Sequence, residues 1–335
     1  MKERRGLVLA RKKKEKETQE ARLSYKRSFR RYWDLYLLLI LPIIYFCVFK
    51  YKPMEALIIA FKDYKIKLGY LASPWAKEFN METGLSQINI FTHFIRFFKS
   101  AYFGQILWNT VSLSVLQLLF GFPIPILLAL IMNEIKKNRV KKTLQMVTYL
   151  PHFISTVVLI AIVQAMVAPQ TGIFNKIIMA LGGEGVYFIS KPEWFKPLYI
   201  ISGIWQNAGY SSIIYLATLT NIDPQLIEAA KIDGANRLKV IWHIMIPGIL
   251  PTAITLLIIN FGKVMNVGFE KVYLMHNSMN ASVSEVISTY IYKQGIESNQ
   301  YSYSTAVGLF NAVINIILLV VVNKISKKVS DTSLW

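Results

Sequence analysis

The sequence is poor in the residues from which most metal and catalytic centres are built. Its 335 residues include one cysteine, Cys47, and four histidines. One cysteine cannot form a disulfide within the chain, and the histidines are scattered without the spacing of a metal-ligand cluster. The sequence therefore predicts no metal site and no catalytic cluster, which argues against an enzyme.

Charged residues are also scarce. They make up 17% of the chain, against 54% hydrophobic residues, whereas soluble domains carry about 25% charged residues. The composition therefore predicts a membrane protein. Acidic residues number 19 against 38 basic ones, and the basic surplus lies between apolar runs. This placement is typical of membrane topology and argues against a nucleic-acid partner.

A nucleotide-binding motif is missing as well. The pattern Gly-x-x-x-x-Gly-Lys-Ser/Thr does not occur, and the glycine-rich stretch 182–185 is not followed by Lys-Ser or Lys-Thr. We interpret that stretch as a turn. We expect no cofactor in this chain.

Apolar runs of spanning length predict an all-α, polytopic membrane protein with six transmembrane helices, because a span takes about 20 mostly apolar residues. Prolines at 42, 123, 125 and 151 predict kinks or breaks in the first three spans. The expected spans are 32–49, 106–132, 144–168, 197–220, 248–265 and 304–322.

Basic segments predict which ends of the spans face the cytoplasm. Residues 1–31 hold thirteen Lys and Arg, and further basic clusters lie at 136–142 and 324–328. The positive-inside rule then places both termini in the cytoplasm, with a basic tail 1–31, a transmembrane domain 32–323 and a short tail 324–335. Residues 50–105 hold eight basic residues and fit the rule poorly. A signal peptide is the alternative for the first segment, although no cleavage pattern follows it.

Between the fourth and fifth expected spans, residues 223–247 predict two short helices that stand outside the membrane. Asp223-Pro224 is a helix-start pattern, and Gly234 predicts a left-handed elbow. The residue before a proline avoids helical geometry, so the second helix should end at Ile246-Pro247. Its expected apolar face is formed by Leu238, Ile241, Trp242 and Met245. An amphipathic hairpin lying on lipid is the alternative.

The 223–247 loop resembles the EAA loop of permease subunits in type I ABC importers. The pattern is Glu-Ala-Ala, then Asp-Gly-Ala, then Ile-Pro at matching spacing. The resemblance implies that the loop carries coupling helices that dock into a partner ATPase, which binds the ATP and magnesium. The residues that carry it are Glu228, Ala229, Ala230, Asp233, Gly234, Ala235 and Pro247.

Four further segments are similar to the LplB/YteP-like branch of carbohydrate permeases: 61–64, 266–273, 301–310 and 333–335. This resemblance implies half of a heterodimeric pore in a bacterial plasma membrane. The implied partners are a second homologous permease, two ABC ATPase subunits, an extracellular lipid-anchored solute-binding protein, membrane lipid and an oligosaccharide.

A sugar path requires polar and aromatic side chains at membrane depth, where they are costly unless they face a cavity. On the fourth expected span such residues fall on one helical stripe. The alternative for each is hydrogen bonding between packed helices. The candidates are Asn109, Gln117, Gln164, Trp205, Gln206, Asn207, Tyr210, Asn260, Lys263 and Asn266.

Two other kinds of transporter remain open. An ion-coupled secondary transporter usually needs a carboxylate within the membrane, and the interiors of the six expected spans contain no Asp or Glu. An importer of the same class could instead carry a peptide, an amino acid or a metal. Only the resemblance to the carbohydrate branch favours a sugar. A membrane enzyme or scaffold is the remaining alternative.

Overall fold

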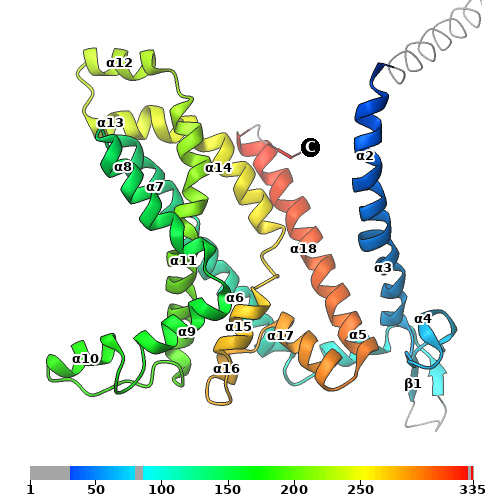
Figure 1. The fold of residues 1–335 in the computed structure, drawn as a ribbon. Helices are drawn as coiled ribbons and strands as arrows, with labels where there is room; N and C mark the ends of the chain where they lie inside the picture. The colour runs from blue at the N-terminus through cyan, green and yellow to red at the C-terminus, as the bar shows by residue number, and fades with distance from the viewer. Residues whose placement is uncertain (1–30, 80–85, 331–332, 335) are drawn as a thin grey trace, which may run out of the picture. The chain divides into compact units, whose positions relative to one another are not determined.

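A computed structural model describes residues 31–79, 86–330 and 333–334. The chain divides into two compact units, Met1–Ile58 and Ile59–Trp335. Figure 1 traces the helices that make up most of the chain. Apart from Arg31, the predicted tail 1–31 lies outside the described residues.

The described part of the first unit is helical. Helix α2, Trp33–Phe46, contains Pro42 and is followed by a π-helical turn, Cys47–Tyr51, and by α3, Lys52–Met54. The helical run continues through Glu55–Phe61, so the first candidate span is longer than the predicted 32–49. None of the α2 residues is buried, as suits a helix surrounded by lipid.

Three further long apolar helices lie in the second unit. One consists of α6, Phe103–Gly121, and α7, Pro123–Glu134, which meet at Phe122. A second runs from α13, Arg237–Val240, into α14, Ile246–Phe261. The third is α18, Tyr301–Ser330, which extends beyond the predicted end at 322.

The third expected span is sharply bent. Helix α8, Asn138–Tyr149, and α9, Thr156–Met166, meet at an angle of 105° across the 3-10 turn Leu150–Phe153. Pro151 lies in that turn, which agrees with the predicted break. Among the described residues, four helices are long and apolar enough to cross a membrane, and this bent pair would be a fifth.

Helix α11, Pro192–Thr220, is the predicted fourth span and the central helix of the second unit. It has 29 residues, but it is not among the described helices that are long and apolar enough to cross a membrane. It packs against α6, α7, α8 and α14. Its central position explains why residues along its whole length are buried, from Phe195 to Leu219.

Short elements fill the segments between the long helices. The first of these segments contains α4, Gly69–Ala72, the antiparallel strands β1, Lys77–Phe79, and β2, Ser86–Ile88, and then α5, Thr92–Phe98. The later ones contain α10, Ile173–Ala180, α15, Phe269–Met275, α16, Ala281–Ser284, α17, Ile287–Tyr292, and a π-helical turn, Lys293–Glu297.

Three buried apolar clusters hold the second unit together. The first joins α7, α11 and the α13–α14 helix through residues such as Met132, Leu219 and Ile249. The second joins α6, α9, α11 and α15 around Leu113 and Val272. The third joins α5, α6, α17 and α18. The first two clusters share α11, so that helix passes from one to the other.

The 223–247 loop contains α12, Pro224–Ile232, followed by the start of the α13–α14 helix. The predicted break at Ile246-Pro247 is wrong. Residues Ile241–Met245 form a π-helical turn in which the Ile246 amide donates to the carbonyl of Ile241. This wider turn accommodates the proline, which lacks an N–H and would clash in a regular helix. Figure 1 shows α12, α13 and the end of α18 at the same end of the second unit.

Candidate functional site

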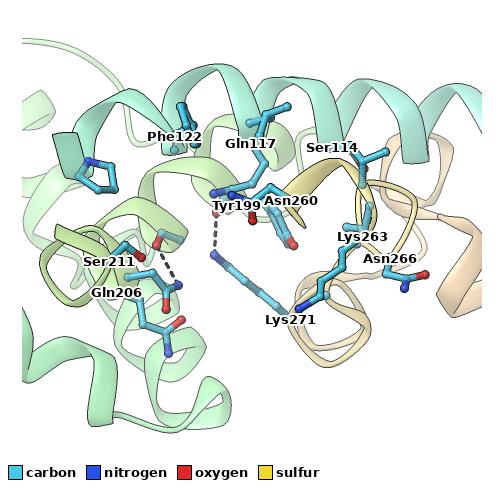
Figure 2. A pocket seen from close by; sticks show the side chains of 18 of the residues that line it. Ser114, Gln117, Phe122, Tyr199, Gln206, Ser211, Asn260, Lys263, Asn266 and Lys271 are labelled. Atoms are coloured by element: carbon cyan, nitrogen blue, oxygen red, sulfur yellow. Dashed lines mark hydrogen bonds between the residues drawn. The ribbon is translucent and has the colours of Figure 1, made fainter. Parts of the chain in front are cut away.

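A cavity of about 780 Å³ lies in the second unit, with α6, α11, α14 and α15 around it. Figure 2 shows the side chains that extend into it. Its wall is apolar where Leu113 and Tyr215 border the second and first clusters. Its polar residues include Ser114, Gln117, Gln206, Asn207, Tyr210, Ser211, Asn260, Lys263, Asn266, Glu270 and Lys271.

The cavity brings together most of the predicted path residues from three separate parts of the sequence. These residues are Gln117, Gln206, Asn207, Tyr210, Asn260, Lys263 and Asn266. Some of their hydrogen-bonding groups have protein partners. Gln206 donates to the carbonyl of Ile154 at 3.0 Å, and Asn207 donates to the carbonyl of Gly203 at 3.1 Å.

Three predicted path residues do not line the cavity. Asn109 is buried, and its side-chain amide donates to the carbonyls of Ser282 at 2.9 Å and Glu285 at 3.1 Å. It therefore ties α6 to the segment around α16, as the helix-packing alternative describes. Gln164 and Trp205 are exposed on α9 and α11, outside the cavity wall.

Lys271 is a cavity residue that the sequence did not indicate, because residues 266–273 were expected outside the membrane. Its ammonium group donates to the carbonyl oxygen of Tyr199 at 2.7 Å and lies 4.4 Å from the centre of the Tyr199 ring. It lies on α15, beyond the spanning α13–α14 helix. Burial lowers the pKa of Lys271 to about 7. The signal that could have identified Lys271 is its position as a charged residue in the 266–273 motif, directly after the fifth expected span.

Gly203 leaves room for this ammonium group on the wall formed by α11. A Cβ atom at that position would lie 3.0 Å from Nζ of Lys271 and 3.2 Å from Oε1 of Gln117. The Gln117 oxygen is buried and has no hydrogen-bond partner. Gly203, Lys271 and Gln117 thus form a small polar recess, which we call the Gly203 recess.

Aromatic rings stand beside the cavity. The rings of His152 and Tyr210 are stacked, with centroids 3.9 Å apart and an angle of 4° between their planes. Phe153 meets Tyr210 edge-on at 6.3 Å. Of these three rings, only that of Tyr210 belongs to the cavity wall, and the stack with His152 covers one of its faces.

The 223–247 loop has the local geometry that its sequence predicts. Asp223 caps α12 by accepting from the Gln225 amide at 2.9 Å. Gly234 has a φ of 75°, in the left-handed region where a glycine is favoured. The sequence did not indicate the second cap, in which Asn236 accepts from the Lys239 amide at 2.9 Å.

One side of this loop packs on the protein and the other faces outward. Ala230 and Ala235 contact the first apolar cluster. Glu228, Ala229, Asp233, Gly234 and Pro247 are exposed. The expected apolar face of the second helix is divided, since Met245 is buried, Ile241 is half-buried, and Leu238 and Trp242 are exposed.

The outward side carries large apolar side chains in addition to its charged ones. Ile232 is 86% exposed and Leu238 is 68% exposed. Exposed apolar groups bordered by charged groups are typical of a surface that contacts another protein or a membrane. Across the described ranges, no group of three or more His, Cys, Asp or Glu residues could hold a metal ion.

Comparison with known proteins gives concordant matches. Residues 121–331 match the family described as "binding-protein-dependent transport system inner membrane component". The chain is 42% identical to the polygalacturonan/rhamnogalacturonan transport system permease protein YteP of Bacillus subtilis, over 96% of this chain and 95% of that protein. It is also 42% identical to protein LplB of Bacillus subtilis, over 93% of this chain and 94% of that protein.

The fold is similar to a chain of a bacterial ABC transporter that imports the acidic polysaccharide alginate. That match has a TM-score of 0.80 and 40% identity, and covers 91% of this chain and 98% of the other. A second structure of a bacterial alginate ABC transporter contains a periplasmic protein with a bound alginate pentasaccharide.

Proposed function

Because the chain belongs to the family of binding-protein-dependent transport system inner membrane components, we propose that it is one of the two pore-forming subunits of an ATP-driven oligosaccharide importer. The observation that carries this proposal is the polar cavity on α11. Its volume of about 780 Å³ falls within the range of about 300–1,000 Å³ that is usual for small-molecule sites.

The cavity chemistry suits a carbohydrate. Amide groups of Gln117, Gln206 and Asn260 offer donors and acceptors to sugar hydroxyls, and Tyr210 adds an aromatic ring with a hydroxyl group. The similarity to permeases and importers named for polygalacturonan and alginate supports this cargo class. An amino acid or a metal ion would use fewer of these neutral groups.

The energy for transport reaches the pore through the 223–247 loop in this proposal. Two separate ATPase subunits bind ATP and magnesium, and each docks on the coupling loop of one permease. The exposed Glu228, Asp233 and Gly234, together with the apolar Ile232 and Leu238, form the docking surface on this chain. The loop then faces the cytoplasm, as do both chain termini.

The remaining partners follow from the same assignment. A second, homologous permease completes the pore. An extracellular lipid-anchored solute-binding protein delivers the oligosaccharide to the opposite face, a role supported by the periplasmic protein in the similar alginate transporter. The chain itself performs no catalysis.

Reconstitution tests the proposal. The purified assembly of both permeases and the ATPases is placed in lipid vesicles with the solute-binding protein on the outer side, and uptake of labelled oligosaccharides is measured. We expect uptake only when ATP and magnesium are inside the vesicles. Uptake driven by an ion gradient without ATP would contradict the proposal and favour a secondary transporter.

A further inference from the structure

The cavity wall carries more positively charged than negatively charged side chains. Lys263 and Lys271 line the cavity together with one acidic residue, Glu270. Within residues 31–79, 86–330 and 333–334, no ion pair joins any of these three to a partner. Unpaired cations within a membrane protein are costly and usually serve a substrate or an ion. The wall therefore has cationic groups available for an anion.

The two lysines differ in how they are held. Lys271 is buried, and its bond to the carbonyl of Tyr199 fixes the ammonium group at 2.7 Å from that oxygen. This bond uses one of the three N–H donors of the ammonium group. Lys263 is exposed in the segment between α14 and α15. Figure 2 shows both side chains extending to the same cavity.

The Gly203 recess adds a group of complementary chemistry. The Gln117 oxygen has no hydrogen-bond partner. A Cβ atom added at Gly203 would lie 3.0 Å from Nζ of Lys271 and 3.2 Å from this oxygen, so both groups border the same recess. An acceptor beside an ammonium group matches a molecule that presents a hydroxyl donor close to a carboxylate. A uronic acid residue has this arrangement, because its carboxylate and hydroxyls are attached to one ring. A neutral sugar would leave the ammonium group without an anionic partner.

We propose that the cavity selects acidic oligosaccharides, with Lys263 and Lys271 binding a sugar carboxylate and Gln117 accepting a hydrogen bond from a neighbouring sugar hydroxyl. The two lysines are specificity-determining residues, and they act after the solute-binding protein has released its cargo. The inference rests on the proposed function. Membership of the family leaves the charge of the cargo open, and the wall of this cavity decides it.

Binding to the purified permease–ATPase assembly, without the solute-binding protein, tests the inference. The probes are trigalacturonate and the neutral trisaccharide obtained by reducing its carboxylates to alcohols. They share linkage and ring size and differ in charge. Isothermal titration calorimetry gives both affinities for the wild type and for Lys263→Met and Lys271→Met. Lys176→Met is the matched control, since Lys176 is exposed on α10 and lies outside the cavity wall.

We expect the wild type to bind trigalacturonate at least about tenfold more tightly than the reduced trisaccharide, because charge-assisted hydrogen bonds are the stronger ones. Each cavity Met variant should weaken binding of the acid by about tenfold and change binding of the neutral sugar by less than about twofold. Lys176→Met should change neither. Lys263→Arg should keep the preference for the acid, since the charge is retained.

Equal affinity for the two probes would overturn the inference, and so would the same loss for both probes in the Met variants. Failure of both probes to bind the wild type would overturn it as well. These outcomes differ from failure of the proposed function. ATP-driven uptake of the neutral trisaccharide with no preference for the acid would leave the function intact. Absence of ATP-driven uptake of any oligosaccharide would refute the function itself.

Discussion

The side-chain amide of Asn315 donates to the amide oxygen of Asn266 at 3.1 Å, and this bond joins α18 to the segment between α14 and α15. Asn315 also accepts from the backbone amide of Met265 at 3.1 Å. Asn266 thus holds the cavity wall in place as well as lining it. Its oxygen is occupied by the protein, so its N–H groups are the ones left for a ligand.

The Asn315→Leu variant should loosen this segment. It removes both hydrogen bonds and leaves the buried backbone N–H of Met265 without its partner, which costs about 1–3 kcal/mol, whereas the Asn266 oxygen keeps its hydrogen bond from Asn311. We expect a lower melting temperature of the purified assembly in detergent. The control is Ile316→Ala, because Ile316 is 61% exposed on the same helix. Identical melting of the Asn315 variant and the wild type would contradict this role.

The close contact between α8 and α11 leads to a second prediction. A Cβ atom at Gly209 on α11 would lie 2.1 Å from the backbone oxygen of Thr148 on α8, so the two helices must separate to admit any side chain. We expect Gly209→Ala to cost more than about 2 kcal/mol, as overpacking does in well-packed interiors, and to lower the yield of folded protein. Gly104→Ala has open space around its Cβ and should be tolerated. Normal yield and melting of Gly209→Ala would refute the prediction.

The proposed coupling role of the 223–247 loop can be tested with two glycines that share one backbone conformation. Gly234 has a φ of 75° and Gly182 a φ of 85°, and at either position an added Cβ atom would have no other atom within 4 Å. Alanine at either position costs roughly 1–2 kcal/mol of local strain. We expect Gly234→Ala to reduce uptake per ATP hydrolysed, and Gly234→Glu to abolish uptake while the protein still inserts.

Gly182→Ala is the matched control, since Gly182 follows α10, far along the chain from the coupling loop. It should leave the ratio of uptake to ATP hydrolysis unchanged. Uptake and hydrolysis are measured on the same vesicles. Near-normal uptake by Gly234→Glu would remove the loop from the coupling mechanism.

The affinity for an acidic oligosaccharide should depend on pH. Burial lowers the pKa of Lys271 to about 7, and the other titratable groups on the cavity wall are Lys263, Glu270, Tyr199, Tyr210 and Tyr215. A carboxylate binds the protonated lysine. Below about pH 7 the lysine is charged in the empty cavity and the affinity changes little. Above that pH a proton must be taken up on binding, so the affinity falls by up to about tenfold per pH unit.

Calorimetry with trigalacturonate from about pH 5.5 to about pH 8.5, on either side of that pKa, checks this sign. Lys271→Met should give a flat profile over the same range, and the reduced trisaccharide should give one in the wild type. An affinity that rises with pH would contradict the role of Lys271.

The sequence predicted the membrane class, the helical fold and the family, and the family match confirms the resemblance carried by the 223–247 loop. The membrane class and the helix ends could be predicted because hydropathy and helix capping depend on residues that are close together in the sequence. Asp223 and Gly234 act within a few residues of their own position, so their geometry follows from neighbouring residues. Gln206, Asn207 and Tyr210 fell on one stripe because helical periodicity fixes which side chains share a face.

Tertiary contacts account for what the sequence did not predict. Lys271 lines the cavity only because α15 packs against α9 and α11, and no local pattern specifies that packing. Asn109 has the chemistry of a path residue, but its partners around Ser282 are more than 170 positions away in the chain. The helix through Pro247 depends on a π-helical turn, which hydrophobic periodicity does not indicate.

In the proposed transport cycle, that uninterrupted helix would act as a lever arm. From Arg237, within the 223–247 loop, to Asn260, on the cavity wall, the run covers 24 residues of the Arg237–Phe261 helix, or about 35 Å at about 1.5 Å per residue. A rotation of about 5° at the loop end would displace the far end by about 3 Å, close to the length of one hydrogen bond. A hinge at Pro247 would have dissipated that motion.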